Sequence, residues 1–372
     1  MVEVKEVRTR KERREFLSFA NKLYKGNKNY VPPLYSDEKK IFRSDYVYYD
    51  TCEAVYFNAY RDGKMAGRIS GIIQKAANEK YNEATVRFTR FDAVDDAEVA
   101  RKLFEAVENW GRQKKMKRIV GPLGFSDLER EGLLIHGFDC GSTFEEQYNA
   151  EYYQRLIEPL GYEKDVDWIE SRIKVPEKLD ESYDKLSEAV LRRSGLHWGE
   201  AKNVNEFIKK YADGFFHILD RSYEKLYGTV PFTENMKKMM LDNFRLIIQL
   251  KFVSVVVDDH DEVKGLAICF PAIGDALAGT DGKLYPHRLP KLFRIIRKPK
   301  HIDLGLIGVD PEYLNSGLSV CFIVRMAHMA IDEKIEYAET NLNLEDNAAI
   351  RNLWKRFDAT ENKRRRCYRK EL

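Results

Sequence analysis

The chain has 372 residues, which is long enough for two domains of ordinary size. Hydrophobic residues make up 44% of the chain and charged residues 33%, a balance that is typical of globular proteins and excludes a disordered or membrane-embedded chain. The 63 basic and 60 acidic residues leave a formal net charge of +3, so the overall charge does not indicate a nucleic-acid partner.

The cysteine spacing and the N-terminal residues indicate in which cell compartment the protein is expected. Five cysteines are widely spaced and include no Cys-x-x-Cys pair, which argues against a disulfide framework and against a bound metal. The segment from Met1 to Glu6 carries charges where a signal peptide needs an apolar core, and no apolar run is long enough to span a bilayer. We therefore expect a cytoplasmic protein without a transmembrane segment.

The first half of the chain predicts a mixed α/β unit from its alternation of helical and strand periodicity. The glycine-rich segment 121–143 predicts an ordered loop over one end of the sheet. In chain order we predict a helix around 16–24, a hairpin of strands 54–60 and 65–73, a strand at 85–91, a helix at 95–114, a strand at 118–120, a helix at 149–160 and a closing strand at 168–174.

The second half repeats this order of elements, which indicates an internal repeat. The polar, proline-containing segment 175–180 separates a domain at 1–175 from a domain at 181–372. The predicted elements are helices at 182–194, 204–227 and 233–243, a hairpin of strands 252–257 and 263–270, a basic insertion that includes 292–298, a strand at 302–309, a helix at 318–332, a strand at 337–344, a helix from 347 and a closing strand that includes 366–369.

The segment that follows the strand at 302–309 has the features of an anion site. It runs from Gly308 to Ser319 and leads directly into an apolar amphipathic helix. Consecutive backbone N–H groups at a helix N-terminus, with a glycine that permits close approach, can bind a pyrophosphate, and the helix dipole adds to the attraction. A lone glycine at Gly317 would equally serve a strand-to-helix turn, so the surrounding residues decide.

Together with Asn347 at the start of a later helix, this segment resembles the GNAT superfamily of acetyltransferases. In that family a loop of the pattern Arg/Gln-x-x-Gly-x-Gly/Ala holds the CoA pyrophosphate, and an Asn meets the pantetheine arm. The sequence keeps Gly317 and Asn347 but has Leu314 and Ser319 where the family pattern differs. The resemblance implies acetyl-CoA, or another acyl-CoA, as co-substrate. The implied binding residues are Gly308, Val309, Leu314, Asn315, Ser316, Gly317, Leu318, Ser319, Asn347 and Trp354.

The catalytic groups are less directly indicated. The family's frequent general acid, a Tyr, falls at Trp354, whose indole cannot protonate a thiolate and which also fits a core position. Tyr368 or Tyr313 would then serve the leaving sulfur, or the thiolate leaves unprotonated. An attacking amine must lose a proton, and Glu339 and Glu345 are the carboxylates that we expect to accept it.

The first half has the same predicted architecture without the loop. No glycine lies between Gly71 and Gly111, and three carboxylates in the segment 91–96 would repel a pyrophosphate. We therefore expect a degenerate GNAT-like domain at 1–175 and a CoA-binding GNAT domain at 181–372. Short motifs resemble a bacterial family of two-module GNAT proteins, which implies two tandem GNAT folds, each an α/β unit with a mixed, mostly antiparallel sheet flanked by helices. The motifs are Val31-Pro32-Pro33-Leu34, Gly121-Pro122, Gly137-Phe138-Asp139 and Leu344-Glu345-Asp346-Asn347-Ala348.

The function that these features predict is transfer of an acetyl or other acyl group from CoA to a small-molecule or peptide amine by direct attack. One alternative is a non-catalytic acyl-CoA-binding or scaffold protein, which the departures from the family pattern favour. Another is a peptidyltransferase that uses aminoacyl-tRNA, because the basic stretches 294–300 and 363–366 offer contacts to phosphates. The insertion at 292–298 also leaves open a peripheral contact with a membrane. The acceptor, the acyl chain length and the oligomeric state stay open.

Overall fold

A computed structural model describes residues 1–224, 226–355 and 357–372. In the first half, the predicted helix, hairpin and βαβ segment are present, and Asp62 and Gly63 take the left-handed conformation that a tight hairpin turn requires. The elements are β1 (Val2–Glu6), α1 (Arg10–Leu23), α2 (Tyr35–Glu38), η1 (Lys39–Phe42), η2 (Val47–Asp50), β2 (Cys52–Arg61), β3 (Lys64–Gln74), α3 (Lys75–Tyr81), β4 (Thr85–Ala93), α4 (Ala97–Gln113), β5 (Arg118–Gly121), β6 (Leu133–His136), α5 (Tyr153–Ile157), η3 (Glu158–Leu160) and β7 (Glu163–Lys174).

The second half follows the same order with an added helix in the basic insertion. Its elements are α6 (Glu181–Ser194), β8 (His197–Trp198), α7 (Val204–Tyr223), α8 (Glu234–Ile247), η4 (Leu250–Phe252), β9 (Val253–Val257), β10 (Val263–Pro271), α9 (Gly274–Leu277), η5 (Pro286–Arg288), α10 (Leu289–Arg297), β11 (His301–Val309), η6 (Pro311–Tyr313), α11 (Leu318–Asp332), β12 (Tyr337–Thr340), β13 (Asn343–Leu344), α12 (Ala348–Trp354) and β14 (Ala359–Glu371).

The segment between β5 and α5 differs from the prediction. The predicted loop contains β6, which pairs with β14. The predicted helix at 149–160 begins only at Tyr153, because the Asn149 side chain bonds both backbone groups of Leu134 in β6 instead of joining a helix. It still ends where expected, at Gly161 with a positive φ.

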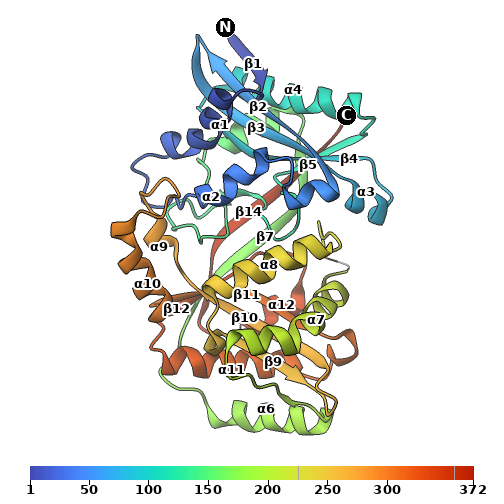
Figure 1. The fold of residues 1–372 in the computed structure, drawn as a ribbon, viewed down its shortest axis with the longest axis vertical. Coiled ribbons are helices and arrows are strands. Elements are labelled where there is room, and N and C mark those ends of the chain that lie inside the picture. The colour runs from blue at the N-terminus through green and yellow to red at the C-terminus, as the bar shows by residue number, and fades with distance from the viewer. Residues whose placement is uncertain (225, 356) are drawn as a thin grey trace.

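The strands form one continuous sheet in the order β1-β2-β3-β4-β5-β14-β7-β12-β11-β10-β9-β8. Figure 1 shows the first half in the upper part of the molecule and the second half in the lower part, with the long strands β7 and β14 running between them. Helices α1 and α4 pack on the first-half strands, and α7 and α11 pack on β10 and β11. The two halves are therefore joined through their sheets.

The closing strands of the two halves are exchanged. We expected the strand at 168–174 to complete the first half, but β7 pairs with β12 and β13 of the second half. In return β14, the last strand of the chain, pairs with β5 of the first half, placing Tyr368 opposite Gly121. The two exchanged strands pair with each other from Ala359 to Arg369. Each sheet is consequently completed by the other half of the chain.

A buried ionic cluster lies where β7 and β14 pair. The Glu170 carboxylate forms an ion pair with Lys363 Nζ at 2.7 Å and accepts a hydrogen bond from Arg365 Nε at 2.6 Å. All three side chains are fully shielded from solvent. Because a buried charge is costly unless it is paired, this cluster favours one register between the two strands.

Replacing Glu170 with Ala should lower the free energy of unfolding by about 3–5 kcal/mol, because Lys363 and Arg365 would keep buried charges without their closest counter-charge. Urea denaturation followed by tryptophan fluorescence measures the change. The control is Glu361→Ala on β14, the strand that carries Lys363 and Arg365, which removes an exposed pair with Arg351 and should cost at most about 1 kcal/mol. Equal losses in the two variants would contradict a special role for the buried cluster.

Candidate functional site

Strands β11 and β12 separate part-way along their length and leave a wedge in the sheet. They pair in parallel only from His301 to Leu304 on β11 and from Tyr337 to Thr340 on β12. Beyond this point β11 continues along β10 to Val309. The segment that follows β12 instead turns away and forms β13 against β7. Among the described residues of the second half, β11 and β12 are the neighbouring strands that run parallel, and the wedge is the gap where their pairing ends.

A glycine shapes the side of the wedge that β11 forms. The register with β10 shifts between Ile268 and Cys269, so Gly305 is an extra residue in β11. A Cβ on Gly305 would lie 2.2 Å from Cε2 of Phe270, and only glycine fits there. Across the wedge, the Asn341 amide donates to the Gly305 carbonyl at 3.5 Å. The sequence analysis did not single out Gly305, although a glycine inside an apolar strand is itself a signal for a bulge.

Backbone groups of β11 point into the wedge. The Asp310 N–H donates to the Lys264 carbonyl of the β10 side, and because strand residues alternate between edges, Val309 and Ile307 direct their backbone groups to the other edge. Their carbonyls accept from the Ser222 hydroxyl at 2.8 Å and the Tyr223 hydroxyl at 3.2 Å. The N–H groups on this edge are suited to bind an extended polar chain.

The loop after β11, which the sequence analysis predicts to be an anion site, turns directly into α11. Gly317 has a φ of 93° and forms the N-cap of α11, where no side chain caps the helix. Ser316 supports the turn, since its hydroxyl accepts the Leu318 N–H and its carbonyl accepts from Arg193 at 2.9 Å. A substituent other than hydrogen would strain Gly317 at this positive φ. The predicted loop residues thus lie together at the start of a helix of 15 residues.

The wedge opens into a cavity of about 1080 Å³ between the two halves. Its lining on the second-half side is mainly apolar and includes Met236, Met239, Met240 and Phe244 of α8, Ile268 and Phe270 of β10, and Ile323 and Met326 of α11. Its lining on the first-half side is rich in charged groups and includes Glu38, Arg68, Arg90, Asp92, Arg130, Glu145 and Glu146. One space is therefore apolar in one part and charged in another.

The structure brings only some of the predicted CoA-binding residues to this cavity. Trp354 donates its indole N–H to Asn343 at 3.1 Å, and Asn347 uses its side-chain oxygen to cap α12 at the Ile350 N–H. The predicted residues that line the cavity are Val309, Leu314, Ser319, Asn347 and Trp354. Those that lie on the same segment but outside the lining are Gly308, Asn315, Ser316, Gly317 and Leu318.

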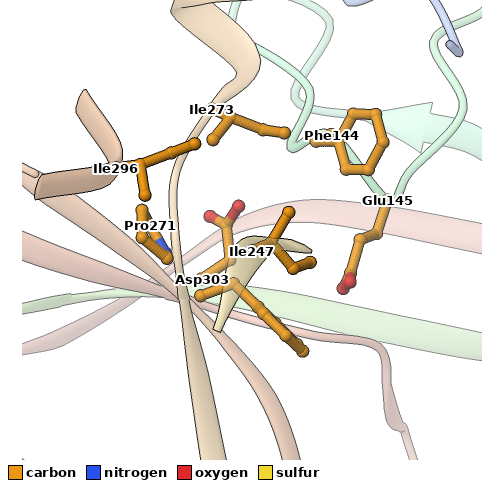
Figure 2. Close-up of a pocket in the computed structure, with 8 residues that line it drawn as sticks. Phe144, Glu145, Ile247, Pro271, Ile273, Ile296 and Asp303 are labelled. Atoms are coloured by element: carbon orange, nitrogen blue, oxygen red, sulfur yellow. The ribbon is translucent and has the colours of Figure 1, made fainter. Parts of the chain in front are cut away.

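Two carboxyl groups that the sequence analysis missed line the same small cavity beside the wedge. Asp303 of β11 and Glu145 of the loop before α5 line a small side cavity of about 20 Å³, enough for one water molecule (Figure 2). Glu145 also lines the large cavity. Burial raises the pKa of Glu145 to about 7, partly offset by Arg130. Burial and the neighbouring Glu145 raise the pKa of Asp303 well above its usual range.

The Asp303 carboxyl has a free acceptor. Its Oδ1 atom is buried and has no hydrogen-bond partner among the described residues. Such an unpaired oxygen is costly in a folded protein unless water or a ligand reaches it. The side cavity supplies space for a water molecule beside Asp303, and Glu145 lines both this cavity and the large one.

The predicted bases are engaged elsewhere. Glu339 accepts from Arg172 at 2.6 Å and from Asn362 at 2.9 Å. Glu345 pairs with Lys164 and Arg364. Neither glutamate lines the large cavity. Both glutamates are thus already paired with cations in this structure.

Tyr368 is not brought to the wedge. It lies on β14 opposite Gly121 and packs in the hydrophobic core of the first half. Its hydroxyl donates to Glu158 at 3.0 Å. The strand exchange explains the difference, because the chain end that carries Tyr368 completes the first sheet instead of the second. Its predicted role as the acid for the leaving sulfur does not fit this position.

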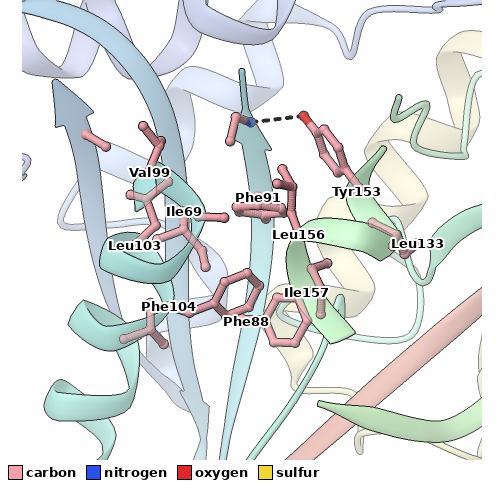
Figure 3. Close-up of a cluster of buried hydrophobic side chains, with 14 of the residues drawn as sticks. Ile69, Phe88, Phe91, Val99, Leu103, Phe104, Leu133, Tyr153, Leu156 and Ile157 are labelled. Carbon is pink, nitrogen blue, oxygen red and sulfur yellow. Dashed lines mark hydrogen bonds between the residues drawn. The ribbon is translucent and has the colours of Figure 1, made fainter. Parts of the chain in front are cut away.

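The corresponding place in the first half is closed. Leu123 N–H donates to the Phe88 carbonyl, so the chain after β5 folds back onto β4. The Asp96 carboxylate caps the N-terminus of α4 by accepting from Glu98 and Val99. Figure 3 shows Tyr153 hydrogen-bonded at the end of β4 and the aromatic core beside it, and this bond joins its hydroxyl to the Ala93 N–H. A helix end that already holds a carboxylate leaves no place for a phosphate.

The chain has relatives of similar length among known proteins. No family model matches the sequence. The chain is 25% identical over 366 residues to protein YghO of Escherichia coli strain K12, which covers 96% of this chain and 92% of YghO. It is 26% identical over 378 residues to the bacterial ceramide synthase of Caulobacter vibrioides, which covers 98% of this chain and 96% of that protein.

Solved structures show the fold. A tandem GNAT protein from the clavulanic acid biosynthesis pathway superposes with a TM-score of 0.56 at 10% identity, covering 100% of this chain and 98% of that one. The glucosamine N-acetyltransferase region of a fungal multi-domain beta-N-acetylglucosaminidase gives a TM-score of 0.54 at 12% identity, covering 100% of this chain and 38% of that one. The chain therefore has the tandem GNAT fold, which confirms the predicted fold class and the resemblance.

The described residues include neither a candidate metal site nor a helix suited to span a membrane. Within residues 1–224, 226–355 and 357–372, no three His, Cys, Asp or Glu side chains are grouped so that they could hold a metal ion. None of the described helices combines the length and the apolar character needed to cross a membrane.

Replacing Gly305 with Ala should push the Phe270 ring out of its place and destabilise the protein by about 1–3 kcal/mol, because a core overfilled by one methyl group must shift its neighbours. Thermal unfolding measures the loss. Gly141→Ala is the matched control, since a Cβ there meets no atom within 4 Å and should change little. An unchanged midpoint for Gly305→Ala would contradict the tight contact.

Proposed function

We propose that the protein is an acyl-CoA-dependent N-acyltransferase that joins a long acyl chain to the amine of a long-chain amino alcohol. The observation that carries this proposal is the continuity of the wedge with a cavity of about 1080 Å³. Pockets for drug-sized ligands span about 300–1,000 Å³, so this space lies just above that range and exceeds what an acetyl group and a small amine need.

The donor would lie along the wedge. Its pantetheine arm would follow the edge of β11 that carries the backbone groups of Ile307 and Val309, and its pyrophosphate would lie at the start of α11 near Gly317. The side-chain donor that the GNAT pattern has at the position of Leu314 is absent, and Leu314 is 57% exposed. Backbone N–H groups and the helix dipole would therefore carry the phosphate contact.

The acyl chain would occupy the apolar part of the cavity. Methionines and aromatic rings line it, and flexible methionine side chains adapt to chains of differing shape. The name of the Caulobacter relative points to the same chemistry, since a ceramide is an amide between a fatty acid and a long-chain amino alcohol. The charged part of the cavity would then receive the polar end of the acceptor.

The reaction would need one proton acceptor. The amine nitrogen attacks the thioester carbonyl carbon, a C–N bond forms, the C–S bond breaks, and CoA leaves as the thiolate or thiol. Glu145 has a pKa of about 7 and faces the cavity, so near neutral pH it can take the proton that the amine loses, directly or through a water in the side cavity. Backbone N–H groups of the wedge edge would stabilise the oxyanion.

The donor test compares acyl-CoA chain lengths with one long-chain amino alcohol as acceptor, and thiol release is followed with a chromogenic reagent. We expect kcat/KM for palmitoyl-CoA to exceed that for acetyl-CoA by at least tenfold, because only the long chain fills the apolar part. Met240→Trp, which narrows this part, should reduce the preference for the long chain while leaving acetyl transfer unchanged. A preference for acetyl-CoA and short amines would overturn the long-chain assignment but keep the acyltransferase. Binding of acyl-CoA without release of thiol would instead support a scaffold.

The base is tested by pH dependence. Glu145 acts as the carboxylate, so kcat/KM should rise with pH and level off above about 7, as the group loses its proton. Glu145→Gln should lower kcat by about 10²–10⁴ and remove the inflection near pH 7, with acyl-CoA affinity unchanged. The control is Glu151→Gln, an exposed glutamate of the same loop region, which should leave the profile intact. Retention of the inflection in Glu145→Gln would assign the proton to another group.

A further inference from the structure

Helix α10 in the basic insertion presents an apolar face that the protein leaves uncovered. None of its nine residues is buried. Phe293 is 55% exposed, and Leu289, Leu292 and Ile296 lie beside it at helical spacing, each only half-buried. Figure 1 shows α9 and α10 at the left edge of the molecule, beside the junction of the two halves. A helix with this much apolar surface in water indicates a further contact.

The same segment carries a concentrated positive charge. Between residues 282 and 302 there are seven lysines and arginines and neither an aspartate nor a glutamate. Of these seven, Lys300 pairs with Glu336. The other six form no ion pair with any described residue: Lys283, Arg288, Lys291, Arg294, Arg297 and Lys298. Their charge is therefore available to an external anionic surface.

The patch adjoins the cavity. Leu284, which is 49% exposed, also lines the large cavity, and Ile296 of α10 lines the side cavity that holds Asp303 and Glu145. Tyr285 beside them is 37% exposed. The insertion is held to the body of the protein, since Gly282 accepts the Tyr35 N–H and Lys291 donates to the Asp275 carbonyl. The exposed apolar residues are consequently continuous with one wall of the cavity.

We propose that this patch, the face made by Leu284, Tyr285 and α10, docks on an anionic phospholipid membrane and places the mouth of the cavity against the lipid. Apolar side chains flanked by arginines and lysines match an interface in which acyl chains lie below anionic headgroups. RNA would use the cations but would gain nothing from the exposed Leu284 and Phe293. The docking itself is independent of the proposed reaction, and its use for collecting a long-chain amine from the bilayer rests on that reaction.

The contact is expected to be reversible and sensitive to salt. A helix of nine residues buries little apolar surface, so electrostatic attraction to anionic lipid contributes much of the affinity. Binding should therefore be strong on anionic vesicles at low ionic strength and weak on neutral ones.

Sedimentation of the full chain with vesicles tests the proposal without any substrate. Vesicles of phosphatidylcholine with 30% phosphatidylglycerol should bind the protein at least tenfold more tightly than pure phosphatidylcholine. The double variant Arg294→Glu/Arg297→Glu should lose at least tenfold in partition coefficient, and Phe293→Ser should lose several-fold on the same vesicles. Arg10→Glu/Lys11→Glu makes the same charge change on exposed α1 residues and should bind like the unaltered chain.

Several results would overturn docking on a membrane. One is equal vesicle binding by the two double variants, and another is full vesicle affinity of the Phe293→Ser protein. A third is that vesicles bind none of the proteins, whereas tRNA shows a mobility shift at physiological salt that the α10 variants abolish. Self-association in gel filtration that the α10 variants abolish, again without vesicle binding, would assign the patch to a second copy. Thermal unfolding of each variant verifies that it is folded. Because no acyl-CoA is present, failure of the proposed reaction leaves this result unaffected.

Discussion

The pairing of β7 with β14 is the contact on which the rest of the structure depends. Each strand completes the sheet of the opposite half, and the buried cluster of Glu170, Lys363 and Arg365 lies between them. A joint of this kind cannot bend like a linker, because ladder hydrogen bonds and buried charges would have to break together. The two halves are consequently held in one arrangement, and a cavity with walls from both can persist.

The two GNAT-like halves differ at the place where the parallel strands separate. In the second half the strands part after Leu304 and leave the wedge open to the cavity. In the first half the chain after β5 closes onto β4, and Asp96 occupies the helix end where a phosphate would bind. The loops of the first half instead supply Glu145 and Arg130 to the shared space. One half is thus open to the cavity along its wedge, and the other provides charged groups opposite it.

The charge distribution agrees with a lipid-like acceptor. Apolar residues line the part of the cavity next to the wedge, and the exposed apolar residues of the α10 segment continue that wall to the surface. An amphiphilic molecule has an apolar chain and a polar end. The cavity has an apolar part for the chain and a charged part for the polar end. A small polar amine would require neither the volume nor the exposed insertion, and the proposed long-chain acceptor would use both.

Local sequence patterns determined the order of helices and strands, the repetition of that order, and the turn at Gly317, because periodicity and positive-φ glycines act over a few neighbouring residues. They also singled out the segment from Val309 to Ser319, of which Val309, Leu314 and Ser319 line the cavity. Only the tertiary structure decided which strands pair, since β5 and β14 meet across more than two hundred residues of chain and the pattern of a strand does not name its partner. The same exchange carried Tyr368 away from the wedge. Glu145 and Asp303 come together for this reason too, and their shared burial, which sets their pKa values, exists only once the two halves are joined.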